Sequence, residues 1–144
     1  GFGLLIFFIS INNIYSEESN FNFKVGEKKN IKNYIIEFEK LETSKVDNYK
    51  TIIGHFLILN KKNLVTENLK PEIRVYDQPK TITYEAYIKS NLLSDLYITM
   101  SSISGSDIFN VKFQKKPFMN FIWLSVLFIS FGGILNFFNK RKKI

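Results

Sequence analysis

The residue types that carry most protein chemistry are sparse in this sequence. It contains no cysteine and a single histidine, His55, which lies in the apolar run 52–57. The lack of thiols excludes disulfide scaffolds, thiol catalysis and cysteine-ligated zinc or iron–sulfur sites. A lone histidine disfavours a histidine-based catalytic triad. We therefore expect His55 to be a packed or strand-edge residue rather than a ligand.

Neighbouring carboxylates are the remaining candidates for acid–base chemistry. Glu37 and Glu39 would share one face of a strand, and Glu17-Glu18 opens the polar part of the chain. General acid–base catalysis needs such groups in a cleft that shifts their pKa values, so solvated carboxylates are the better interpretation. The sequence also lacks a phosphate-binding loop, a dinucleotide fingerprint and a nucleophile elbow. We expect no catalytic, cofactor-binding or metal-binding residue here.

The net charge of +7 is unevenly distributed. All 13 acidic residues lie between Glu17 and Asp107, whereas the last four charges, at 140–143, are all basic. A nucleic-acid-binding domain would need a basic face, but lysine and glutamate are mixed through the middle of the chain. We expect no nucleic-acid partner.

The elements that would position these residues are framed by two apolar ends. Residues 118–138 contain no charge, follow two lysines and precede the basic tail 139–144. At about 1.5 Å per residue, a helix of this length crosses a hydrocarbon core of roughly 30 Å, and Trp123 suits the membrane interface. The sequence predicts a transmembrane helix over 117–138, with the lipid bilayer as a partner. A buried core helix is the alternative, but little chain remains to cover it.

The first 14 residues are equally apolar but too short to span a bilayer alone. A signal peptide would start with methionine and carry a basic segment, whereas this sequence starts with Gly1. We expect residues 1–14 to be the C-terminal half of a transmembrane helix whose first half is missing, so that the chain is a membrane protein fragment. A mature secreted N-terminus is the alternative.

The positive-inside rule gives the expected orientation. It places the basic tail 139–144 in the cytoplasm or in the mitochondrial matrix. Residues 15–116 then form an extracytoplasmic domain. The expected location is a bacterial inner (plasma) membrane or a mitochondrial inner membrane.

Residues 15–116 have the alternation and composition of β structure. The predicted strands cover residues 21–25, 34–39, 49–59, 73–75, 95–99 and 108–113. Predicted turns lie at residues 25–27, 60–63, 77–79 and 104–106. Short strands spaced about ten residues apart predict a small antiparallel sandwich or barrel between the two apolar helices. The segment 84–93 could instead be a short helix.

Five blocks of this sequence occur in a familiar order. The final apolar segment carries Lys-Pro, Ile-Trp-Leu and Gly-Gly-Ile-Leu, which are similar to the patterns KPxxxxIWLG and GGxL. A second block, residues 69–76, is similar to the pattern L-x-PE-x-R-x-Y. Other blocks are similar to TTEAAI, to DLYV and to a spaced NY and G. Together they resemble the cytochrome c-type biogenesis protein CcmF family. The residues matched by this resemblance are Asn48, Tyr49, Pro71, Glu72, Arg74, Tyr76, Thr83, Glu85, Asp95, Tyr97, Pro117 and Trp123.

The resemblance implies a large polytopic haem lyase subunit of cytochrome c maturation. Such proteins join the vinyl groups of haem to the CxxCH thiols of apocytochrome c on the extracytoplasmic side. The resemblance also implies a haem chaperone, a thioreductive haem lyase subunit and apocytochrome c as partners. The haem-ligating histidines are expected upstream of Gly1, so this chain alone should bind no haem, and the matched residues should be structural or docking residues. The alternative is an unrelated membrane-anchored β domain that acts as a non-enzymatic binding module.

Arg74 has the most specific expected contact among the matched residues. Pro71 fixes φ at the start of a strand, and Arg74 and Tyr76 then share one strand face. The planar fork of an arginine suits a carboxylate, and Glu85 and Asp95 are the expected acceptors. An exposed, solvated Arg74 is the alternative.

Overall fold

The computed structural model describes residues 1–31, 34–59 and 64–141. The predicted turn at 60–63 and the last three residues of the basic tail lie outside this part of the chain. The chain divides into two compact units, which we call the helical unit and the β unit. The helical unit comprises Gly1–Glu17, Ser90–Asp95 and Lys115–Ile144, and the β unit comprises Glu18–Lys89 and Leu96–Gln114.

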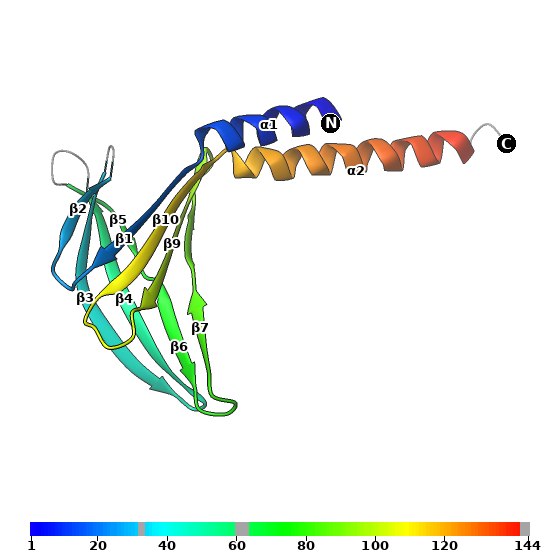
Figure 1. The fold of residues 1–144 in the computed structure, drawn as a ribbon. Coiled ribbons are helices and arrows are strands. Elements are labelled where there is room, and N and C mark those ends of the chain that lie inside the picture. Colours follow the sequence, from blue (N-terminus) through cyan, green and yellow to red (C-terminus); the bar gives the residue numbers. More distant parts are fainter. Residues whose placement is uncertain (32–33, 60–63, 142–144) are drawn as a thin grey trace. The chain divides into compact units, whose positions relative to one another are not determined.

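Two helices and a series of strands make up the described chain (Figure 1). The helices are α1 (Phe2–Tyr15) and α2 (Met119–Arg141). The strands are β1 (Glu17–Phe23), β2 (Lys28–Ile31), β3 (Tyr34–Val46), β4 (Tyr49–Leu59), β5 (Val65–Leu69), β6 (Glu72–Tyr76), β7 (Thr81–Glu85), β8 (Tyr87–Ser90), β9 (Ser94–Ser102) and β10 (Phe109–Pro117).

The strands form two sheets. Within the described residues, the smaller sheet has four strands in the order β1-β10-β9-β8, and the larger has six. The larger sheet has the order β2-β3-β4-β6-β7, and β5 pairs with β4. Strand β4 is central, because β3 lies along one of its edges while β5 and β6 divide the other edge between them. The pairings of the larger sheet are antiparallel, as the sequence predicts.

The core lies between the two sheets, which makes the domain a sandwich rather than a barrel. Its buried hydrophobic residues come from β1, β9 and β10 of one sheet and from β2 to β6 of the other. Three phenylalanines mark its centre: the ring of Phe56 stacks on Phe38 at 4.4 Å and meets Phe23 edge-on at 5.9 Å. Aromatic pairs of these geometries add to the stabilisation that burial alone provides.

Gly54 lets the two sheets approach each other closely. A Cβ atom at this position would lie 2.7 Å from Sδ of Met100 in β9 and 2.7 Å from the ring of Phe56. Both neighbours are fully buried, so the space that a side chain would need is already filled. Glycine in a strand often marks such an approach.

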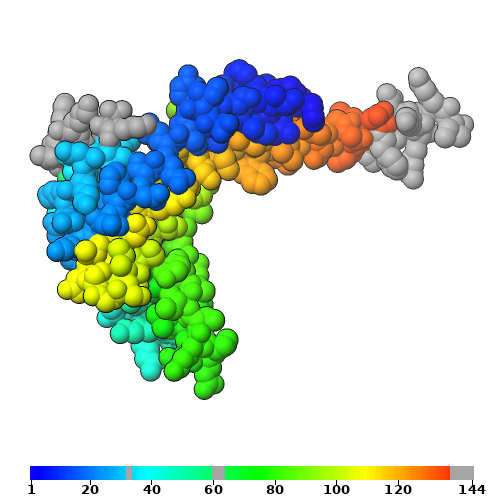
Figure 2. Space-filling model, in the orientation of Figure 1, coloured from blue at the N-terminus to red at the C-terminus, as the bar shows by residue number. Residues whose placement is uncertain are grey.

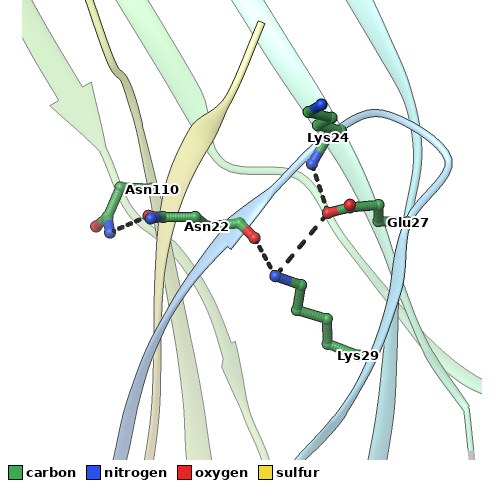
Figure 3. Close-up of polar contacts among 5 residues, drawn as sticks. All are labelled: Asn22, Lys24, Glu27, Lys29 and Asn110. Atoms are coloured by element: carbon green, nitrogen blue, oxygen red, sulfur yellow. Dashed lines mark hydrogen bonds and ion pairs between the residues drawn. The ribbon is translucent and has the colours of Figure 1, made fainter. Parts of the chain in front are cut away.

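A polar network ties the first strands together where the chain passes from one sheet to the other (Figure 3). In the turn after β1, Oε2 of Glu27 accepts a 2.9 Å hydrogen bond from the backbone N–H of Lys24. Nζ of Lys29 in β2 donates to the carbonyl of Asn22 in β1, and Asn110 of β10 donates to the Asn22 side chain at 2.9 Å. These contacts join β1 to β10 of its own sheet and to β2 of the other sheet.

The sequence and the structure differ in three local features. Segment 84–93, which could have been a short helix, contains the end of β7 and the whole of β8. Strands β2, β5, β7 and β8, each of four or five residues, were not predicted. Val25 does not continue the alternation of Phe21 and Phe23, since β1 ends at Phe23 and Val25 is exposed.

The helical unit pairs two apolar helices. Within the described residues, one helix is long and apolar enough to cross a membrane, over Met119–Asn136 of α2. The shorter α1 lies along α2, blue beside orange in Figure 2, and the rings of Phe8 and Phe121 stack at 5.1 Å. The hydroxyl of Ser125 donates to the carbonyl of Phe121 in its own helix at 2.8 Å, so this polar group is satisfied without water.

Candidate functional site

Six of the matched residues gather on one face of the larger sheet. The register pairs Tyr49 with Tyr76 between β4 and β6, and Glu72 with Glu85 between β6 and β7. Directly paired residues project to the same face of a sheet, and alternate residues of one strand share it. The intervening Ile73 is 1% exposed and faces the core, so these side chains point outward. We call this set the matched face: Tyr49, Glu72, Arg74, Tyr76, Thr83 and Glu85.

Arg74 is held by a carboxylate and an aromatic ring. Its Nε and Nη2 donate to Oε2 of Glu72 at 3.1 and 2.9 Å. Its guanidinium lies 5.4 Å from the ring centroid of Tyr49, and that ring lies 5.1 Å from the ring of Tyr76. The hydrogen bonds that Arg74 donates to the Glu72 carboxylate raise the pKa of Arg74 above its ordinary value, and desolvation by partial burial opposes this shift.

The expectation that Glu85 or Asp95 accepts from Arg74 is wrong. Glu72 stands two residues earlier on the same strand face, within reach of the guanidinium. The carboxylate of Glu85 accepts instead from the hydroxyl of Thr83 at 3.1 Å. Asp95 belongs to the helical unit. The side chains of Arg74 and Glu72 are 33% and 31% exposed, so the pair is intermediate between the buried and solvated alternatives.

Two matched residues lie beside this face and act through the backbone. The carbonyl of Pro71, just before β6, accepts from the Gly54 N–H at 3.0 Å, and the carbonyl of Asn48 accepts from the Asp77 N–H at 3.1 Å. Pro71 therefore stands where the partner of β4 changes from β5 to β6. Asn48 joins the tip of the β3–β4 hairpin to the end of β6.

The other matched residues are not part of the matched face. Asp95 and Tyr97 lie on β9 of the smaller sheet, Pro117 ends β10, and Trp123 is exposed on α2. Asp95, Pro117 and Trp123 belong to the helical unit. Pro117 has a defined contact there, because its carbonyl accepts from the side-chain amide of Asn12 in α1.

A depression of about 320 Å³ lies at the tip of the β6–β7 hairpin. It shares Tyr76 with the matched face and contains one acidic and one basic residue. It is lined by Val75, Tyr76, Asp77, Lys80, Thr81 and Ile82.

His55 is a buried residue whose Nε2 is engaged by a carboxylate. It is 6% exposed in β4, and its Nε2 lies 3.0 Å from Oε2 of Glu42 in β3. The contact follows from the hairpin register. Glu42 lies opposite Ile53, and Ile53 is two residues from His55 along β4. Counting back from the turn at 47–48 would have found this pair, which the sequence reasoning missed. Among the described residues, no group of three histidine, aspartate or glutamate side chains could hold a metal ion.

The comparisons with known proteins decide the family. The family model described as the CcmF C-terminal beta-sandwich matches residues 14–117. The chain belongs to the CcmF family. This membership excludes the alternative of an unrelated β domain.

Related proteins match over nearly the whole chain. It is 28% identical to the cytochrome c-type biogenesis protein CcmF of Haemophilus influenzae, over 98% of this chain and 22% of that protein. It is 26% identical to the CcmF protein of Escherichia coli, again over 98% and 22%. A solved structure of the cytochrome c haem lyase CcmF has the same fold, with a TM-score of 0.66 and 14% identity over 91% of this chain and 22% of that one. The chain thus spans about a fifth of the length of these relatives.

Proposed function

We propose that this chain is the C-terminal part of a CcmF-like haem lyase subunit. In that protein it supports the covalent attachment of haem to the CxxCH thiols of apocytochrome c on the extracytoplasmic side. The observation that carries the proposal is the match of the CcmF C-terminal family model to residues 14–117. The spanning length and composition of α2 agree with a membrane protein.

The proposed arrangement has four parts. Residues 1–14 and 117–138 lie in the membrane, residues 15–116 form the extracytoplasmic domain, and residues 139–144 form a basic tail in the cytoplasm or matrix. The membrane is a bacterial inner membrane or its mitochondrial counterpart. The proposed partners are the lipid bilayer, a haem chaperone, a thioreductive haem lyase subunit and apocytochrome c.

We propose that this chain holds no haem on its own. A haem-ligating histidine must point a ring nitrogen at the iron, whereas His55 is buried and its Nε2 is engaged by Glu42. The chain contains no cysteine, and one of its two methionines, Met100, is buried in the sandwich core. Haem would therefore be held by other parts of the full-length protein. The role proposed for the β unit is structural support and docking.

The matched face is the proposed docking surface. It presents the Arg74–Glu72 pair flanked by two tyrosine rings and by Thr83 and Glu85. Arginine and tyrosine are over-represented among residues that dominate protein–protein binding energy. The proposed partner for this face is a protein segment of the maturation system.

Substitution of Arg74 in the full-length protein tests this proposal. Arg74→Ala removes the bidentate fork, and Arg74→Lys keeps the charge while losing the planar geometry. Lys28→Ala is the matched control, because it removes a 2.9 Å pair with Glu37 in the same sheet and outside the matched blocks. Steady-state protein and holocytochrome c are measured for each variant.

We expect Arg74→Ala to lower holocytochrome c while the protein level stays near that of Lys28→Ala. Loss of both together would assign Arg74 a structural role only. Unchanged holocytochrome c would refute docking through this residue. Normal cytochrome c maturation after removal of the entire protein would refute the proposed function itself.

A further inference from the structure

Two adjacent leucines are unusually exposed in the loop between β8 and β9. Leu92 is 73% exposed and Leu93 is 61% exposed, and the residues on either side of them are polar. The loop is ordered by a 3.1 Å hydrogen bond from the Asn91 N–H to the Ser94 carbonyl. Two adjacent exposed leucines present apolar surface that a partner or a membrane can cover, and the place of the loop in the helical unit decides between them.

Hydrogen bonds fix this loop at the start of α2. The backbone N–H of Phe118 donates to the carbonyl of Leu93 at 2.8 Å. The side-chain amide of Asn120 donates to the carbonyl of Asn91 at 2.9 Å. The loop and the two helices belong to the same compact unit. Because the candidate membrane span begins at Met119, the loop lies level with the first residue of that span.

The contacts of helix α1 also place the start of the apolar segment of α2 at the loop 91–93. The side chain of Asn12 donates to the carbonyl of Pro117, one residue before Phe118. At the other end of α1, a Cβ on Gly1 would lie 2.8 Å from the Ile129 side chain. The polar end of α1 and the loop 91–93 therefore meet α2 where its apolar segment begins, while the rest of α1 runs along that segment.

We infer that Leu92 and Leu93 insert into the extracytoplasmic interface of the lipid bilayer. The occupant of the patch is lipid, because the loop is bound to the first residues of the span and so must lie at the membrane boundary if α2 crosses it. Lys115 and Lys116 precede the span in the same unit and mark the end of its apolar segment. The inference rests on the spanning role of α2 in the proposed function.

Spin labels on single cysteines test this inference in the full-length protein reconstituted into lipid vesicles. Leu92→Cys places a label on the loop. Leu127→Cys, at an exposed position of α2, is the control for the span, and Ser104→Cys, at an exposed turn of the β unit, is the aqueous control. Collision rates are measured with oxygen, which dissolves in lipid, and with a water-soluble nickel complex. Each exposed position tolerates cysteine without disturbing the core.

At position 92 we expect oxygen to collide more often than the nickel complex, as at Leu127 and in contrast to Ser104. A nickel accessibility equal to that at Ser104 would overturn the inference. A label protected from both agents would also overturn it and would show that a protein segment covers the loop. If Leu127 itself collides mainly with nickel, the spanning role of α2 fails, and that result separates the two proposals.

Discussion

At the scale of single residues, Arg74 illustrates how a strand face limits the choice of partner. Its guanidinium reaches Glu72 on its own strand and the Tyr49 ring on β4. Both contacts are partly open to water, so solvent screens the ion pair. Arg74 is therefore placed to present its charge outward as well as to join β6 to β4.

Arg74→Ala should cost little stability. A partly exposed ion pair contributes about 0–1 kcal/mol, and a cation–π contact adds about 0.5–1 kcal/mol. We expect the free energy of unfolding to fall by about 1 kcal/mol, as measured by denaturant titration of the purified protein. A loss of several kcal/mol would show that Glu72 becomes buried without a partner.

Gly54→Ala should destabilise the sandwich markedly. The added methyl group would lie 2.7 Å from Met100 and from Phe56, and overpacking of a core costs about 1–3 kcal/mol. Denaturant titration measures the loss. The double variant Gly54→Ala with Met100→Ala is the control, because the shortened side chain makes room for the methyl group. If the two changes add without interaction, the proposed clash with Met100 is wrong.

We expect neither the isolated chain nor its His55→Ala variant to bind haem stoichiometrically. The ring is buried and engaged by Glu42, so the isolated chain should give no stoichiometric Soret band on titration with haem. The alanine variant serves as the matched blank. A saturable band that disappears in the variant would contradict this prediction.

At the scale of elements, we expect the backbone hydrogen bonds of β4 to be the last in the larger sheet to open. It has β3 on one edge and β5 and β6 on the other, whereas β7 lies at the end of the sheet order. Backbone groups with partners on both edges and a buried face are the best protected against local opening. Its residues Phe56 and Ile58 are almost fully buried.

Hydrogen exchange should therefore be slowest in β4. We expect peptides covering 52–58 to exchange most slowly and peptides covering 81–85 to exchange sooner, as measured by mass spectrometry. The residues on both strands are hydrophobic or β-branched in similar measure, so the contrast reports position rather than composition. Equal protection of the two strands would show that another surface covers the edge of β7.

The sequence predicted the longer β-rich runs and missed four short strands, β2, β5, β7 and β8. The run 49–59 is β-branched and aromatic, and it forms β4 with the predicted bounds. By contrast, Lys28–Ile31 becomes β2 because β3 offers it an antiparallel partner, which is a long-range effect that no local pattern records. Arg74 is a different case: its partner Glu72 is a local neighbour, two residues away on the same strand face, where alternation places it.

The matched face shows a second limit of prediction from sequence. Its residues come from three separate blocks, and only the strand register places Tyr49 beside Tyr76 and Arg74 beside Thr83. Family resemblance supplied the residues individually. Their convergence on one face required the pairing of β4 with β6 and of β6 with β7.

At the scale of the whole molecule, the sidedness of the chain is a testable prediction. The uncharged run 118–138 and the basic tail place residue 144 inside and residue 104 outside by the positive-inside rule. Reporter fusions at Ile144 and Ser104 of the full-length protein should therefore give opposite signals. Identical signals at 104 and 144 would refute the layout.

The single tryptophan lies outside the β unit, so its fluorescence and the signal of the sheets report on different parts of the chain. Trp123 is 64% exposed on α2, while the aromatic core of the sandwich consists of phenylalanines, which emit little light. Tryptophan fluorescence will therefore report the polarity around α2, and its intensity and wavelength will change little when the β unit unfolds. Circular dichroism will follow the sheets. Unmatched transitions in the two signals would then reflect the location of the fluorophore rather than a folding intermediate.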